Sequence, residues 1–218
     1  MDSSPSLNRV ALTKSRIEAL CDGVFAIAMT LMIFNIKVPE IPKDLVRTQI
    51  AHEVFLLWPK LLVYFISFVM LGVYWIGHHN QYHYILSTDR AFLWINIFFL
   101  ACVSLLPFSA GLLGQYPAER TAHVVYGVNL ILIGGFLYEH WQYATRGRRL
   151  VVSDIRLEVV GLAKRRILMA PVAALVAIGI AFLSTRLSLA LFVAIPLLYI
   201  VPGRIDRHWL GSPGKDSG

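Results

Sequence analysis

Six stretches of mostly apolar residues constrain what this chain can fold into. A helix needs about 20 such residues to cross the hydrocarbon core of a bilayer. Of the 218 residues, 57% are hydrophobic and only 15% are charged, which excludes an ordinary soluble domain. The pattern predicts an all-α integral membrane bundle of six transmembrane helices, at residues 17–36, 54–76, 91–113, 122–141, 167–185 and 187–201.

The basic residues predict how these helices are oriented. Most of the 20 lysines and arginines fall on the side that includes both chain ends: Arg9, Lys14, Arg16, Arg90, Arg146, Arg148, Arg149, Arg156, Lys164, Arg165, Arg166, Arg204, Arg207 and Lys215. The opposite side has Lys37, Lys43, Arg47, Arg120 and Arg186. By the positive-inside rule both termini are cytoplasmic. We therefore expect a cytoplasmic N-terminus at 1–16, a transmembrane domain at 17–203 and a cytoplasmic tail at 204–218.

The net charge of +7 has two possible meanings, a nucleic-acid-binding surface or a membrane topology signal. The one-sided distribution favours topology, with the basic cluster at 146–166 beside anionic membrane lipids. No nucleic-acid partner is expected. Cys21 and Cys102 fall inside expected helices without a metal-binding spacing, and we interpret both as small apolar side chains.

Ionisable residues inside apolar segments are costly, so they often mark function. The first expected helix begins near Arg16 and carries Asp22 and Gly23 ahead of the apolar run VFAIAMTLMIFNI. Arg16 could return toward Asp22 and keep its carboxylate ionised. The alternative is a helix start at which the helix dipole favours Asp22.

One face of the first expected helix has an unusual composition. Successive residues turn by about 100° around a helix axis, so Gly23, Ile27, Thr30, Leu31 and Phe34 share one face. From the residues alone this stripe fits a packing or lipid-facing surface. It also fits a pore lining, in which apolar rings exclude water and a hydroxyl contacts the ion.

The start of this helix resembles a known family. In the transmembrane-protein-175 potassium channels, an Arg and three variable positions precede Phe-Ser-Asp-Gly. Arg16, Asp22 and Gly23 match this signature, whereas Leu20 replaces the Phe and Cys21 the Ser. The continuation VFAIAMTLMIFNIKVPE also resembles the family's first helix, and the length and six expected spans resemble a bacterial member over essentially the whole chain.

The resemblance implies a potassium-permeable channel of the bacterial inner membrane. It is expected to be a homotetramer in which four copies of the first helix surround a central pathway without a filter loop. By position, the apolar constriction falls on Ile27, Leu31 and Phe34 and the selectivity hydroxyl on Thr30. The implied partners are other copies of this chain, membrane lipids and monovalent cations, and potassium is the permeant ion rather than a cofactor.

The resemblance also implies a structural and gating network around Arg16, Asp22 and Gly23. Histidines near the end of the second expected helix resemble partners of this network in the family, so His78 or His79 is expected to hydrogen-bond Asp22. Alternatively, these side chains anchor the helix at the lipid headgroups.

Two rival functions remain from the sequence. His78, His79 and His83 resemble a histidine box of a membrane metalloenzyme, although the other histidines are isolated and too sparse for a second complete site. A secondary transporter would require paired broken helices, a pattern that the prolines at 59, 107, 171 and 196 do not form. We expect neither enzyme activity nor a bound cofactor or metal.

Overall fold

The computed structural model describes the backbone of residues 4–200 and the side chains of residues 14–199. The expected tail at 204–218 lies outside the described residues. The described chain is nearly all helical; its helices are joined by connections without regular structure, which contain one isolated β-bridge. Its elements are α1 (Ser4–Leu31), η1 (Met32–Asn35), α2 (Val46–Leu56), α3 (Trp58–Tyr84), α4 (Arg90–Gln115), α5 (Arg120–Thr145), η2 (Arg146–Arg148), α6 (Leu157–Ala181) and α7 (Thr185–Ile200).

Four helical segments of the described chain are long and apolar enough to cross a membrane: Lys14–Asn35, Trp58–Tyr84, Arg90–Gln115 and Arg120–Arg148. These correspond to the first four expected spans. α7 is apolar but has only 16 residues. α6 has its basic residues in its first half, with Ile167 opening the apolar part.

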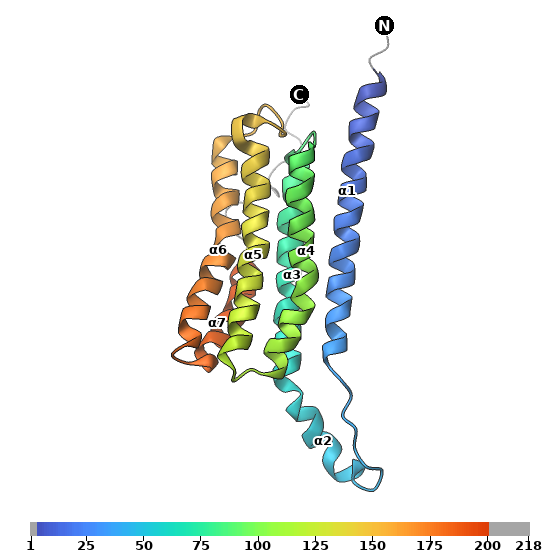
Figure 1. The fold of residues 1–218 in the computed structure, drawn as a ribbon, viewed down its shortest axis with the longest axis vertical. Helices are drawn as coiled ribbons and strands as arrows, with labels where there is room; N and C mark the ends of the chain where they lie inside the picture. The colour runs from blue at the N-terminus through green and yellow to red at the C-terminus, as the bar shows by residue number, and fades with distance from the viewer. Residues whose placement is uncertain (1–3, 201–218) are drawn as a thin grey trace, which may run out of the picture.

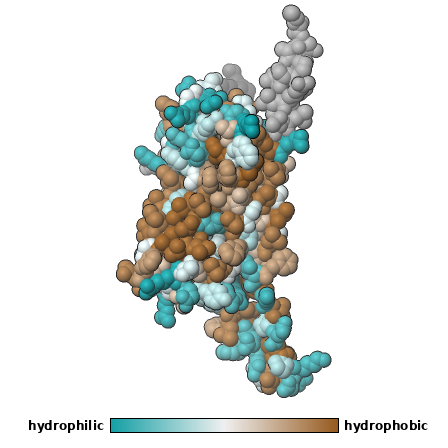
Figure 2. Space-filling model, in the orientation of Figure 1, coloured by the Kyte–Doolittle hydropathy of each residue, from teal (hydrophilic) through white to brown (hydrophobic). Residues whose placement is uncertain are grey.

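The long helices run alternately up and down and lie side by side (Figure 1). α1 stands at one edge of the bundle and packs against α3 and α4, while α5 packs against α4 and α6. α1 starts at the end of the molecule that we call the upper end, as drawn in Figure 1, and α7 runs back toward that end. Tyr199, near the end of α7, is hydrogen-bonded to Arg166 and Ala170 in the middle of α6. Figure 2 shows hydrophobic side chains over the middle of the bundle and hydrophilic ones gathered toward its ends.

Several helices differ from the sequence expectation. α1 begins at Ser4 rather than at 17, and α6 begins at Leu157 rather than at 167. α2 was not expected; it is short, has no buried residue and projects below the bundle (Figure 1). α3 continues past its expected end at 76 to Tyr84. The polar run after 76 ended the apolar window, but the helix continues because His78 and Gln81 are buried against neighbouring helices.

α5 and α6 approach each other closely where α5 has glycine. A Cβ added at Gly134 would collide with the Pro171 ring, and one at Gly127 would lie 2.6 Å from Ile178. A Cβ at the adjacent Gly135 would meet no atom within 4 Å. Small residues at such crossings let membrane helices pack through van der Waals contact.

At the upper end, the α3–α4 and α5–α6 connections are paired. Ile85 and Val151 form the β-bridge, and the Val152 N–H donates to the Tyr84 carbonyl at 3.0 Å. Before it, α5 ends in a turn through Gly147, whose φ of 63° suits a residue without a Cβ. The two connections therefore form one unit.

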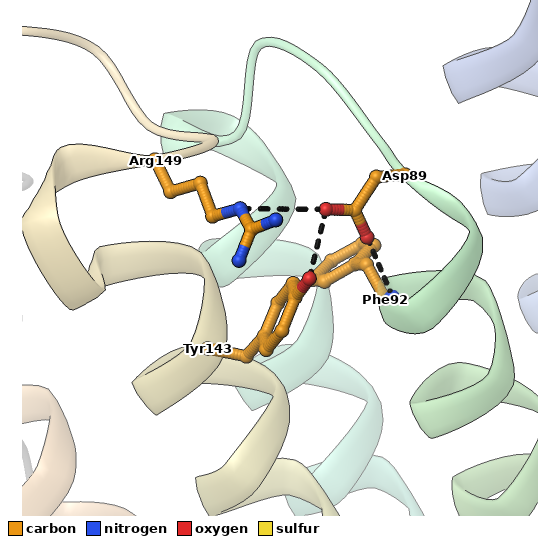
Figure 3. A network of polar contacts seen from close by, with 4 residues as sticks. All are labelled: Asp89, Phe92, Tyr143 and Arg149. Atoms are coloured by element: carbon orange, nitrogen blue, oxygen red, sulfur yellow. Dashed lines mark hydrogen bonds and ion pairs between the residues drawn. The ribbon is translucent and has the colours of Figure 1, made fainter.

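Asp89 stabilises this unit through three partners (Figure 3). Its carboxylate caps α4 by accepting from the Phe92 N–H at 2.9 Å, accepts from the Tyr143 hydroxyl at 2.8 Å and pairs with the Arg149 Nε at 3.6 Å. The Phe92 N–H bond first, then the Tyr143 bond and the Arg149 charge, lower the pKa of Asp89. We call these four residues the Asp89 latch.

Candidate pore-lining site on helix α1

One face of α1 packs into the subunit. Its buried residues recur at spacings of three and four, which places them in one stripe along the helix: Ile17, Cys21, Phe25, Ala28 and, at the start of η1, Met32. Phe25 contacts Phe99 of α4, with ring centres 5.8 Å apart. This stripe fixes the rotation of α1 against α3 and α4.

The opposite face carries the residues expected to line a pore. Ile27, Leu31 and Phe34 are 59%, 47% and 74% exposed, and Gly23 and Thr30 are also exposed. These residues therefore do not pack into the core of their own subunit. The stripe is left facing lipid, another subunit or a pathway.

Thr30 presents an oxygen acceptor on that face. Its hydroxyl hydrogen is directed to the helix backbone, with Oγ1 at 2.9 Å from the Ile27 carbonyl and 3.0 Å from the Ala26 carbonyl. Because a hydroxyl has one donor and two acceptor lone pairs, the oxygen remains able to accept. An exposed oxygen of this kind can contact a cation.

The end of α1 changes its helical form beside the stripe. Residues 32–35 form the 3₁₀ helix η1. In a 3₁₀ helix, side chains three residues apart eclipse each other. This form therefore brings Phe34 toward alignment with Leu31, whereas a regular α-helix would offset the two by about 60°.

Asp22 is bonded differently from the sequence expectation. Its carboxylate accepts a hydrogen bond from Trp75 Nε1 of α3 at 2.7 Å, not from His78 or His79. His79 is exposed and stacks on the Trp75 indole, with ring centres 5.6 Å apart. Arg16 is exposed, and in the described part of the chain it makes no ion pair with Asp22.

Cys21 is a small side chain buried in the core, as expected, but it also makes polar contacts that the sequence did not predict. Asn96 Nδ2 of α4 donates to its sulfur at 3.3 Å, and His78 Nε2 lies 3.6 Å from the same sulfur. His78 Nε2 and Asn96 Oδ1 are 3.0 Å apart, which requires the histidine to donate. Cys21, His78 and Asn96 thus join α1, α3 and α4 inside the bundle.

A second buried polar pair continues this network and was missed from the sequence. His140 Nδ1 of α5 lies 2.6 Å from Gln81 Oε1 of α3, and the Gln81 amide donates to the Leu137 carbonyl at 3.1 Å. The His78 and His140 rings are 5.2 Å apart. Asn96 and His140 are polar residues inside apolar segments, as Asp22 is. Because such residues are costly unless they have partners, the same reasoning from the sequence would have identified both.

The histidines of α3 do not form a metal-binding box with other ligands. Across the described residues, no group of three or more His, Cys, Asp or Glu side chains is placed to hold a metal ion. His78 points into the bundle, whereas His79 is exposed. The polar cluster instead connects helices through hydrogen bonds.

Comparison with known proteins places this geometry in a family. A family model described as the endosomal/lysosomal potassium channel TMEM175 matches residues 16–107, a range that includes the exposed stripe, Trp75, His78 and Asn96. A potassium channel of Streptomyces collinus is 30% identical over 84% of this chain and 90% of its own length. A potassium channel of Chamaesiphon minutus is 32% identical over 84% of this chain and 92% of its own.

A solved structure agrees with these sequence matches. The crystal structure of a lysosomal potassium-selective channel TMEM175 homologue from Chamaesiphon minutus superposes with a TM-score of 0.76 at 30% identity. The superposition covers 87% of this chain and 97% of that one. The similarity therefore extends to the arrangement of the helices.

Proposed function

Because this chain belongs to the TMEM175 family of potassium channels, we propose that it is a potassium-permeable cation channel whose pathway is lined by α1. The family consists of ion channels rather than enzymes, which argues against the metalloenzyme alternative. The observation that carries the proposal is the exposed stripe of Ile27, Thr30, Leu31 and Phe34, which lies opposite the face that packs into the subunit.

The pathway requires several copies of the chain. One helix per subunit cannot enclose a pore, so copies must surround it with closed symmetry. We propose a homotetramer in which α1 and α3 to α7 of each subunit cross the membrane, six helices in all. The alternating directions in Figure 1 support an even number of crossings, because α1 runs down from the upper end and α7, the last helix, runs back toward it.

Conduction would depend on two kinds of side chain. Four copies of Ile27, Leu31 and Phe34 form apolar rings that close the pathway by excluding water. Thr30 supplies a ring of hydroxyl oxygens that contact a partly dehydrated cation. Preference for potassium then follows from the lower cost of removing its water, without a loop of backbone carbonyls.

The polar contacts of α1 would hold the lining in place. Asp22 with Trp75, and Cys21 with His78 and Asn96, connect α1 to α3 and α4 near the upper end. Arg16, Asp22, Gly23, His78 and His79 thus belong to the region that supports the pore helix, with Arg16 exposed on its own subunit.

We place the protein in a bacterial inner membrane with both termini cytoplasmic. The upper end carries the basic connection of η2 and α6, including Arg149 of the Asp89 latch. This end then faces the cytoplasm and the anionic lipid headgroups, following the positive-inside rule.

Reconstitution into liposomes tests this function. Purified protein in vesicles with an outward potassium gradient should give cation flux, with potassium exceeding sodium and no chloride flux. Protein-free vesicles from the same preparation are the control, and native mass spectrometry reports the number of subunits. Anion flux, or no flux under any ionic condition, would reject the channel assignment.

A further inference from the structure

One side chain connects the end of the proposed pore helix to α4. The carboxamide nitrogen of Asn35 donates to the backbone carbonyl of Pro107 at 2.8 Å. Asn35 is the last residue of η1 and directly follows Phe34. The bond therefore fixes the position where the exposed stripe ends.

The carbonyl of Pro107 is accessible because Gly111 follows it by one helical turn. Helical side chains lean toward the N-terminus of their helix, so the residue four positions ahead covers a given carbonyl. A Cβ at Gly111 would lie 2.6 Å from Asn35 Oδ1 and 2.7 Å from its Cγ. The amide of Asn35 thus occupies the space that any other residue at 111 would fill, and we call Asn35, Pro107 and Gly111 the Asn35 clamp.

The clamp acts together with Met32 to orient η1. Met32 is buried at the start of this 3₁₀ turn, and Asn35 is bonded to α4 at its end. Ile33 and Phe34, between them, are exposed. With both ends of so short a segment held, Phe34 has little freedom to leave the direction that brings it toward Leu31.

We propose that Asn35 is a positioning residue of the pore, which holds the 3₁₀ end of α1 so that Phe34 completes the apolar constriction. This inference rests on the proposed channel function. Without the clamp, η1 turns or frays, the four Phe34 rings separate, and the closed pathway admits water and cations more often.

Flux measurements on the full-length channel in liposomes test the clamp through changes at Asn35 and at Gly111. Asn35→Ala removes the amide, Asn35→Asp keeps its shape but lacks the N–H donor, and Gly111→Ala fills its space. Each should raise basal potassium flux by about twofold to tenfold, the range set by the net free energy of one hydrogen bond. Lys37→Ala, an exposed change two residues beyond the clamp, should leave flux unchanged.

A double-mutant cycle separates positioning from general stability. If Asn35 acts through Phe34, Asn35→Ala should raise flux in the native background but not in a Phe34→Ala background. Equal increases in both backgrounds would overturn the proposal, as would native flux in all three clamp variants. Loss of the oligomer in all three would also overturn it, because Asn35 would then maintain the fold rather than the constriction.

Thiol labelling gives a readout that does not depend on conduction. A cysteine introduced by Phe34→Cys should react with a soluble maleimide at a rate that Asn35→Ala changes at least about twofold. Leu20→Cys, at an exposed position near the middle of α1, is the control and should not respond; native Cys21 and Cys102 are buried. If Asn35→Ala leaves the labelling rate at position 34 unchanged, Asn35 does not position this residue. If the labelling rate changes but the native protein gives no potassium flux, only the channel function is refuted.

Discussion

Trp75 Nε1 donates a 2.7 Å hydrogen bond to the carboxylate of Asp22, and so joins α3 to α1. Hydrogen bonds to ionised acceptors are stronger than those between neutral groups. Trp75 thereby has the partner role that the sequence suggested for a histidine, while His78 faces the interior of the bundle. This contact gives the first prediction.

Trp75→Phe should lower the stability of the assembled protein by about 1 kcal/mol, a modest value because Asp22 is exposed and water can replace part of the lost bond. Phenylalanine retains a ring beside His79, so the change isolates the N–H donor. Thermal unfolding in detergent measures it. Trp94→Phe is the matched control, because Trp94 is exposed on α4, and equal effects of the two changes would show that the Asp22 bond contributes nothing.

Leu31→Ser should increase cation leak while the oligomer stays intact, because a polar ring wets an apolar constriction. The same change at Leu105 of α4, which is 54% exposed, serves as control and should leave flux at the native level. Liposome flux and native mass spectrometry are the measurements. Loss of the oligomer without any gain of flux would mean that Leu31 packs between subunits and lines no pathway.

Thr30→Val should reduce the ratio of potassium to sodium flux while the pathway still closes. Valine has nearly the same shape as threonine but lacks the oxygen that can contact a cation. The change also removes the hydrogen bonds from Thr30 to the Ala26 and Ile27 carbonyls, which lie within the same helix. Thr30→Ser retains the hydroxyl and should keep most of the selectivity. Native selectivity in the valine variant would exclude Thr30 from ion contact.

Gly134→Ala should destabilise the subunit by about 1 to 3 kcal/mol, the usual cost of overpacking a close contact. The added methyl would collide with Pro171 where α5 meets α6. Gly135→Ala, one residue further, meets open space and should change stability by less than about 1 kcal/mol in either direction. Thermal unfolding of the two variants compares them directly, and similar midpoints would contradict the close packing.

Asp89→Asn should destabilise the upper end at neutral pH, and the difference from the native protein should disappear in acid. The pKa of Asp89 is lowered in the folded state, so its stabilising contribution is present above the unfolded pKa of about 3.9. That contribution is lost as the pH falls through the lower folded value. Unfolding midpoints measured at pH 7 and in steps below pH 4 test this, and a constant difference at all these pH values would mean that the carboxylate charge is not what stabilises the latch.

The apolar periodicity of the sequence was enough to predict the main helices and to place the residues of the stripe on one face, but not to predict that this face is exposed. Ile27, Leu31 and Phe34 share a face by helical geometry alone, and no tertiary information is needed to place them together. The identity of the contacts made by the other face was harder to predict. Whether Trp75 or His78 meets Asp22 depends on how α1 and α3 are rotated against each other, which the packing of Phe25 and its neighbours decides.

Polar residues caused the remaining differences. The sequence predicted that the second helix ends at 76, because His78 and Gln81 are polar and polar side chains are usually exposed. Both are instead buried and hydrogen-bonded to neighbouring helices. α2 has neither a long apolar window nor a buried residue, so nothing in its composition distinguished it from a connection. The Asn35 clamp joins residues 72 positions apart in the sequence, and only the fold brings them together.

The buried and exposed faces of α1 both depend on the same helical register. The helix therefore does not tolerate a change in its length. Inserting a single residue between Cys21 and Met32 would rotate everything beyond it by about 100° and shift it by about 1.5 Å. The apolar side chains of the outward face would turn toward α4, and the packing residues would turn outward. Evolution can therefore alter the character of this helix by substitution on either face separately, but an insertion or deletion would damage both faces at once.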